Sequence, residues 1–175
     1  VPDRKFYYLI GLHIDYGEYQ DNFSFWASNQ DEEMVIWDLF LKTLNKIDRF
    51  TVAHYGSYDR RALNSMQKKY GGNKLLIERV LSSCVNVLSM IYGQIYFPIY
   101  SNDLKSLASY LDFKWSAKNP SWLQSIIWRH RWEITQNNEY KKILLKYNHE
   151  DCLALRHVME AIYTICKPDM HPESN

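Results

Sequence analysis

Two stretches near the start of the chain, residues 6–14 and 22–27, are rich in aromatic and β-branched residues, a pattern typical of β-strands. The residues between them, 15–21, include Asp and Gly, which favour turns. We therefore predict that the two strands form a hairpin. A third run, residues 50–54, is short, apolar and continuous, which indicates a buried strand.

Most other apolar positions recur every three or four residues, as expected of helices. Asn29 and Glu32 have the spacing of a capping box and predict a helix over about 32–47. Further helices are predicted over 59–70, over 74–93, from Ser101 to Leu111, and over 139–166 with a break near Asn148. This order predicts an α/β fold in which helices cover a mixed sheet.

The length of 175 residues suits one domain, which we place at residues 1–166, followed by a tail or linker over 167–175. Apolar residues make up 46% of the chain and charged residues 23%, a composition that excludes a disordered protein. Because the chain contains 21 Lys and Arg residues and 20 Asp and Glu residues, its net charge is only +1. Any nucleic-acid binding must therefore come from a local basic patch.

Three cysteines, Cys84, Cys152 and Cys166, include no Cys-x-x-Cys pair. Their number and spacing argue against a disulfide framework or a zinc knuckle and indicate a reducing, cytoplasmic setting. Every apolar run is far shorter than the roughly 18 residues of a membrane-spanning helix, so no membrane partner is expected. The sequence also lacks a Gly-rich phosphate loop and a Gly-x-Ser-x-Gly motif, which argues against a small-molecule enzyme on an α/β scaffold.

The segment His54-Tyr-Gly-Ser-Tyr-Asp59 is the first candidate for chemistry. It ends a buried strand, turns at a glycine and places Asp59 at the start of a helix. Ligands of α/β sheets bind at the carboxyl ends of strands, which makes Asp59 a candidate site residue. Position alone favours a simpler role, in which Asp59 caps the helix and offsets its dipole.

The second candidate is Tyr147-Asn-His-Glu-Asp151. Tyr147 and Asp151 are four residues apart, so on a helix they project from the same face. A tyrosine hydroxyl beside a carboxylate can hold a water molecule that a metal has acidified. The alternative is a surface tyrosine next to a solvated acidic pair, although the flanking leucines indicate that part of this segment is buried.

Four short strings in order resemble the DnaQ-like exonucleases of the RNase H-like fold, in the class that carries a Tyr-x-x-x-Asp motif. The strings are Tyr8-Leu-Ile-Gly11, the 54–59 segment, Tyr100-Ser-Asn-Asp-Leu-Lys105 and the 147–151 segment. The similarity is closest to the YprB-type RNase H-like domain that occurs together with RecB-like nuclease domains. It spans about residues 6–165 and implies an RNase H-like mixed sheet flanked by helices.

The sequence differs from the family pattern at one motif. The family carries Asp-x-Glu on its first strand, just upstream of the Tyr-Leu-Ile-Gly string, and residues 1–5 contain no such motif. We expect this motif and its strand to precede Val1, so that the present sequence lacks the first strand of the sheet. The alternative is a domain that has lost the motif.

The resemblance implies a 3′–5′ exonuclease that acts on DNA or RNA with two Mg²⁺ or Mn²⁺ ions held by four carboxylates. Asp59 and Asp151 match two metal ligands, and Tyr147 matches the residue that orients the water. With two of four carboxylates, this chain alone is expected to bind metal weakly and hydrolyse little. A RecB-like nuclease domain in the parent protein is the implied partner. The competing hypothesis is a non-catalytic RNase H-like module that binds nucleic acid or supports a neighbouring nuclease domain.

Nucleic-acid contacts are assigned to Lys105, which lies near a helix start where a phosphate can bind, and to His54. A histidine that ends a buried strand is more often a hydrogen-bonded core residue, and Lys105 can equally be a solvated lysine. The segment from Trp122 to Trp132 mixes aromatic and basic side chains suited to stacking bases and neutralising phosphates. Its tryptophan spacing also fits a buried helix face, and core packing is expected for at least two of the three.

Overall fold

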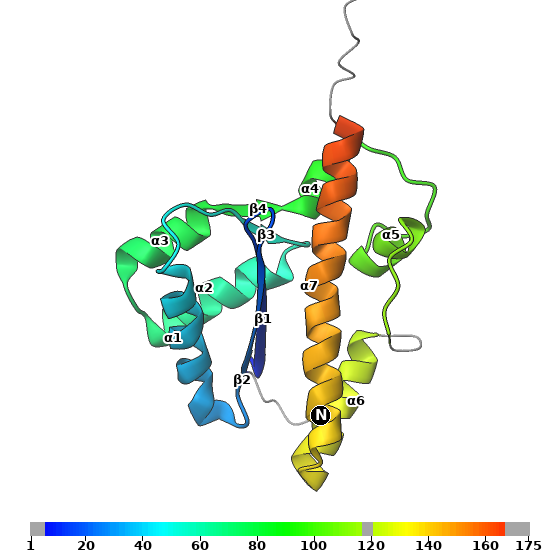
Figure 1. Cartoon of the computed structure of the whole chain (residues 1–175). Helices are drawn as coiled ribbons and strands as arrows, with labels where there is room; N and C mark the ends of the chain where they lie inside the picture. Colours follow the sequence, from blue (N-terminus) through cyan, green and yellow to red (C-terminus); the bar gives the residue numbers. More distant parts are fainter. Residues whose placement is uncertain (1–5, 117–120, 167–175) are drawn as a thin grey trace, which may run out of the picture.

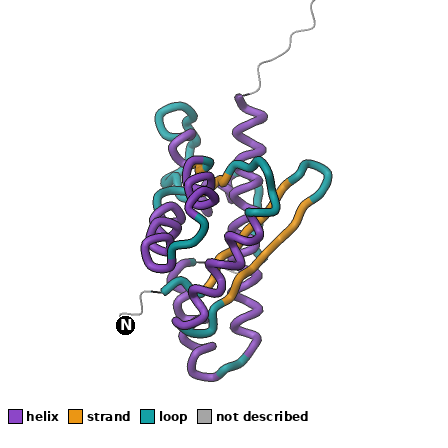
Figure 2. Tube along the Cα trace, turned by 90° about the vertical axis from the view of Figure 1, so that its left-hand side faces the viewer, coloured by secondary structure: helices purple, strands orange, loops and turns teal. Residues whose placement is uncertain are grey.

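The computed structural model describes residues 6–116 and 121–166 (Figure 1). Its first element is the predicted hairpin. Strands β1 (Leu9–Asp15) and β2 (Gln20–Trp26) pair antiparallel, with Leu9 opposite Trp26 and Asp15 opposite Gln20. Figure 2 shows the hairpin as two long neighbouring strands whose turn extends away from the helices.

A second strand pair is parallel. Strand β3 (Val52–His54) pairs with β4 (Cys84–Asn86), so the structure contains both an antiparallel and a parallel strand pair, in keeping with the predicted mixed α/β fold. Among the described residues no strand ladder joins this pair to the hairpin. The predicted helix over 74–93 is wrong in its middle, because β4 separates α3 (Lys74–Ser82) from α4 (Val87–Ile91). Three residues carry too little periodicity to reveal a strand, and pairing with β3 decides it.

The other helices follow the predicted order, except that α6 was not predicted as a helix. They are a 3₁₀ turn η1 (Gln30–Glu32), α1 (Glu33–Leu44), α2 (Tyr58–Tyr70), α5 (Leu104–Tyr110), α6 (Trp122–Thr135) and α7 (Asn138–Cys166). Asn29 caps the first turn as predicted, accepting hydrogen bonds from the backbone N–H groups of Asp31 and Glu32. The tail predicted over 167–175 lies outside the described residues.

Two details of the helix predictions are wrong. The N-cap of α5 is Asp103, whose side chain accepts from the backbone N–H of Ser106, and the predicted cap Ser101 instead accepts from the N–H of Asp103. Helix α7 continues without a break through Asn148. Packing against β1, α5 and α6 supports α7 along its length, which overrides the low helix propensity of one asparagine.

The helices bury two hydrophobic clusters. One contains side chains of α1, α2 and α3 and is covered by residues of the hairpin. The other lies between α4, α5 and the C-terminal half of α7. Helix α7 stands between the hairpin and α5 (Figure 1) and therefore contacts both halves of the molecule. No helix in the described ranges is both long and apolar enough to span a bilayer.

Candidate functional site

Asp59 is the second residue of α2, just after the turn that follows β3. Gly56 makes this turn with a φ of 72°, in the left-handed region that favours glycine. The N-cap of α2 is Ser57, so the simple interpretation of Asp59 as the capping residue is wrong. Although Asp59 is open to solvent, the surrounding protein desolvates it and raises the pKa of its carboxyl, against the lowering effects of His54 and the Tyr55 backbone N–H.

Asp151 and Tyr147 lie one turn apart on α7. The Asp151 carboxylate is half-buried, and its Oδ1 accepts a hydrogen bond of 2.9 Å from the indole Nε1 of Trp115. Burial raises the pKa of Asp151, while the Lys105 ammonium and the Trp115 hydrogen bond lower it. The pKa rises overall because desolvation dominates. The structure therefore holds a partly desolvated carboxylate in a defined orientation.

Lys105 connects α5 to this part of α7. Its Nζ donates a hydrogen bond to the Tyr147 hydroxyl and lies 4.2 Å from the centroid of the Tyr147 ring. Desolvation lowers the pKa of Lys105, whereas Asp151 and Asp103 raise it. Since the Tyr147 oxygen accepts from Lys105, its own O–H is directed elsewhere and can donate to a water or a phosphate oxygen. Burial also raises the pKa of Tyr147, which keeps the hydroxyl protonated.

The structure brings Lys105, Tyr147 and Asp151 into one network, and Asp59 acts on it through its charge. The negative charge of Asp59 is among the effects that raise the pKa of Asp151. Burial, and to a smaller extent the charges of Asp151 and Asp59, raise the pKa of Cys152 to about 12, which keeps this thiol protonated at neutral pH. The chemistry of the site is therefore that of carboxylate, phenol and ammonium groups.

The donor set fits a hard divalent cation in part. Two repelling, desolvated carboxylates favour a bound cation, and Mg²⁺ is commonly held by one or two carboxylates together with substrate phosphates. However, no group of three or more His, Cys, Asp or Glu side chains that could hold a metal occurs within 6–116 and 121–166. Asp59 and Asp151 are fewer carboxylates than a complete metal site needs.

His54 lies apart from the Lys105 network. Its side chain is buried, and Nδ1 is hydrogen-bonded to the carbonyl oxygen of Gly56 at 2.9 Å. This agrees with the expectation of a hydrogen-bonded histidine at the end of a buried strand. The residue nevertheless lines a surface pocket, which is a separate feature of the molecule.

The aromatic and basic segment on α6 is mostly structural. Arg129 is buried and donates to the carbonyl oxygens of Ala27 and Ser28, so its guanidinium is not available as a phosphate contact. Trp132 is buried, and Trp128 is half-buried with its ring 5.9 Å from that of Tyr147. These two tryptophans pack as expected, whereas Trp122 is exposed.

Sequence reasoning missed Trp115. This residue follows α5 in a segment without a recognisable pattern, and its importance arises from the contact with Asp151 across 36 positions of the chain. The aromatic Phe113-Lys-Trp115 string was the only available signal. It could not identify a hydrogen bond to a carboxylate.

Comparison with known families identifies the class of protein. A family model described as RNase H superfamily matches residues 1–163, and the chain therefore belongs to that superfamily. Its proteins usually hydrolyse phosphodiester bonds of nucleic acids and typically use divalent metals. No curated protein and no solved structure matches the chain.

Proposed function

We propose that this chain is the core of a metal-dependent nuclease, a 3′–5′ exonuclease of the DnaQ-like type in the intact protein. Membership of the RNase H superfamily supports hydrolysis of nucleic acid. The observation that carries the proposal is the network in which Lys105 holds the Tyr147 hydroxyl one turn from Asp151, with Asp59 close enough to affect the Asp151 pKa.

In this proposal Asp59 and Asp151 hold Mg²⁺ or Mn²⁺. The ions would activate water and neutralise the charge that develops on the scissile phosphate. Trp115 orients Asp151 through Oδ1, leaving Oδ2 as the oxygen directed to a ligand. Tyr147 positions the attacking water with its O–H, and Lys105 fixes that hydroxyl while its positive charge attracts the phosphate backbone.

A complete two-metal site needs more carboxylates than these two. We propose that an Asp-x-Glu motif on a further strand, upstream of Val1, supplies them. The separation of the hairpin from the β3–β4 pair supports such a strand, because a strand between them would join the two pairs into one sheet. A neighbouring RecB-like nuclease domain would be consistent with the same class of protein.

The test is cleavage of a labelled single-stranded oligonucleotide with Mg²⁺, with Mn²⁺ and with a chelator. The chain and a version extended upstream should be compared. The extended protein should degrade the substrate from its 3′ end only with metal, whereas the 175-residue chain should show little activity. Asp59→Asn and Asp151→Asn should each lower activity at least about 100-fold, and Tyr147→Phe should slow it while metal still binds.

The control for these variants is Asp48→Asn, which removes an exposed carboxylate outside the site and should leave cleavage unchanged. Full activity of Asp59→Asn would show that the ligand assignment is wrong.

A second function deserves the same experiment. Because no group of three or more His, Cys, Asp or Glu side chains that could hold a metal occurs among the described residues, the domain can instead serve as a non-catalytic module that binds nucleic acid. Binding without metal-dependent cleavage in the extended protein would favour this role. Cleavage that depends on both Asp59 and Asp151 would exclude it.

A further inference from the structure

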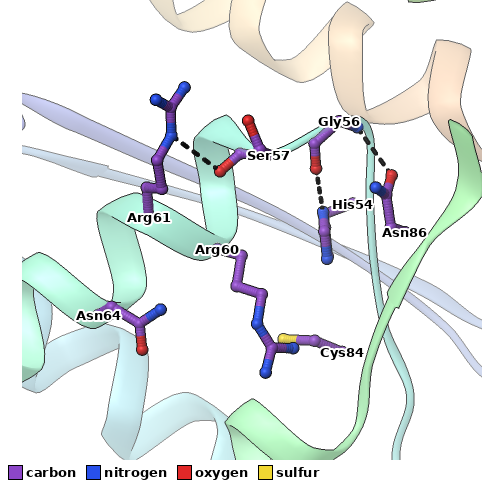
Figure 3. Close-up of a pocket in the computed structure, with 8 residues that line it drawn as sticks. All are labelled: His54, Gly56, Ser57, Arg60, Arg61, Asn64, Cys84 and Asn86. Atoms are coloured by element: carbon purple, nitrogen blue, oxygen red, sulfur yellow. Dashed lines mark hydrogen bonds between the residues drawn. The ribbon is translucent and has the colours of Figure 1, made fainter. Parts of the chain in front are cut away.

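A polar pocket lies at the start of α2, at the carboxyl ends of the two parallel strands. Figure 3 shows it lined by residues that include His54 at the end of β3, Asn86 at the end of β4, and Arg60, Arg61 and Asn64 on α2. Its volume is about 250 Å³. This position is the usual one for ligands of α/β sheets, and a phosphate group fits easily within the volume.

The charges around the pocket favour an anion. Arg60 and Arg61 line it and no Asp or Glu does, although the charge of the nearby Asp59 acts on the lining residues His54 and Cys84. Within the described residues neither arginine forms an ion pair with a carboxylate, in contrast to Arg156, which pairs with Asp15 and Glu160. Arg60 donates to the carbonyl oxygen of Leu81 and Arg61 to that of Ser57. A guanidinium has five N–H donors, so one such bond leaves others for an oxyanion.

The backbone and the amide side chains add further donors. The N-cap residue Ser57 makes no side-chain capping bond, so it leaves the N–H groups of the first turn of α2 without the usual partner. The N-terminus of a 13-residue helix also attracts negative charge. Asn86 accepts from the Gly56 N–H through Oδ1, which leaves its NH₂ group as a donor.

His54 provides an independent indication of a ligand. Its side chain is only 5% exposed, and Nδ1 is engaged with the Gly56 carbonyl. Nε2 has no hydrogen-bond partner among the described residues and points into the space near Arg60 and Cys84 (Figure 3). A ring nitrogen that faces a polar cavity can form a hydrogen bond with a ligand bound there.

We propose that this pocket, which neither Asp59 nor Asp151 lines, binds a phosphate group of a nucleic-acid strand. Arg60 and Arg61 would neutralise the phosphate and the start of α2 would bind its oxygens. The nature of the ligand as a nucleic-acid strand rests on the proposed function, whereas the affinity of the pocket for phosphate does not.

The first test uses inorganic phosphate with the 175-residue chain. Phosphate should raise the thermal unfolding midpoint in a concentration-dependent way, because a ligand that binds only the folded state stabilises it. An equal ionic strength of chloride is the salt control. The shift should disappear in the double variant Arg60→Ala/Arg61→Ala. An equal shift in wild type and variant would overturn the proposal.

The second test measures binding of single-stranded oligonucleotides in a chelator, so that cleavage plays no part. The double variant should bind about tenfold more weakly, and its slope of log affinity against log salt should fall by about 0.7 to 1.4, corresponding to one or two lost phosphate contacts. Arg60→Lys/Arg61→Lys, which keeps the charge, should bind with an intermediate affinity. This second variant tests the pocket even where the alanine variant unfolds.

The matched control is Lys46→Ala/Lys68→Ala, which removes two exposed positive charges elsewhere and should change affinity by less than about twofold. If the alanine and lysine double variants lose the same affinity, the proposed phosphate pocket is wrong. If the double alanine variant loses more affinity for a 5′-phosphorylated strand than for an unphosphorylated one, the pocket binds a terminal phosphate. An equal loss of affinity for both strands would indicate that it binds an internal phosphodiester. If the extended wild-type protein binds nucleic acid through Arg60 and Arg61 but does not cleave it, the proposed nuclease function is refuted and the proposed phosphate pocket is supported.

Discussion

At the scale of single residues, the defining feature is a pair of carboxylates that the protein desolvates without neutralising. The pKa of Asp59 and that of Asp151 are both raised, chiefly by burial. A carboxyl with a raised pKa in the folded state binds its proton more tightly there than in the unfolded chain. The unfolding free energy therefore falls as the pH rises from the ordinary aspartate range through the raised pKa. At neutral pH the ionised groups cost stability, as is common at functional sites.

This predicts the effect of Asp151→Asn on stability. Without metal at neutral pH, the variant should be more stable than wild type by up to about 1 kcal/mol, because a neutral amide is easier to desolvate and its oxygen can still accept from Trp115. Urea denaturation at pH 7 in a chelator measures the difference, with Asp48→Asn as the control. Mg²⁺ should stabilise wild type and not the variant. A variant less stable than wild type would contradict the argument.

At the scale of elements, β1 and α7 approach each other closely at Gly11. A Cβ atom there would lie 2.8 Å from Cγ of Asn148, closer still to its Oδ1, and 3.1 Å from Sγ of Cys152. No real Cβ occupies such a position, so glycine allows the helix to lie directly on the strand. The Oδ1 of Asn148 is buried there without a hydrogen-bond partner. The contact places α7, and with it Tyr147 and Asp151, against the hairpin.

Gly11→Ala should therefore destabilise the protein by about 1–3 kcal/mol through overpacking. The matched variant is Gly11→Ala/Asn148→Ala, which removes the nearest clashing atoms and should recover a large part of the loss. Chemical denaturation of the two single variants and the double variant gives the coupling between the sites. Strictly additive effects would show that the strand and the helix are not packed in this way.

At the scale of the whole molecule, α7 joins the hairpin half to the half formed with α4 and α5. The ion pair between Arg156 Nε and Asp15 Oδ2, at 2.6 Å, links the end of β1 to α7 across 141 positions of the chain. The hydrogen bond from Arg156 is the main effect that lowers the pKa of Asp15. A lowered carboxyl pKa stabilises the folded state above the ordinary aspartate range, and this contribution is lost as the pH falls through the lowered pKa.

Asp15→Asn should thus reduce the unfolding free energy at pH 7 by about 0.5–1 kcal/mol, the magnitude expected for a partly exposed ion pair. The difference between wild type and variant should shrink once the pH falls below the ordinary aspartate range of about 3.8. Urea denaturation at pH 7 and at pH 3 measures both values. A difference that is unchanged at pH 3 would rule out the charge as its cause.

Much of the fold could be predicted because its signals are local. The hairpin, α1, α2 and α7 follow from alternation, capping and helical spacing, and Tyr147 and Asp151 could be placed on one helix face from their spacing alone. Strand β4 could not be predicted, since its three residues are a strand only through pairing with β3. Trp115 and the pocket arginines could not be assigned either, since Trp115 lies 36 positions from Asp151 and the pocket is completed by Cys84 and Asn86 of β4.

The sequence by itself determined the class of fold, the order of most elements and the placement of Tyr147 and Asp151 on one helix face. Local propensity and periodicity encode these properties within a few neighbouring residues. Only the tertiary structure decided that Lys105 and Tyr147 form a hydrogen bond, that Trp115 orients Asp151, that Arg129 is buried and that Arg60 and Arg61 face a pocket. Desolvation, hydrogen bonding and charge interactions depend on distance in space, and folding brings these groups together from separate parts of the chain.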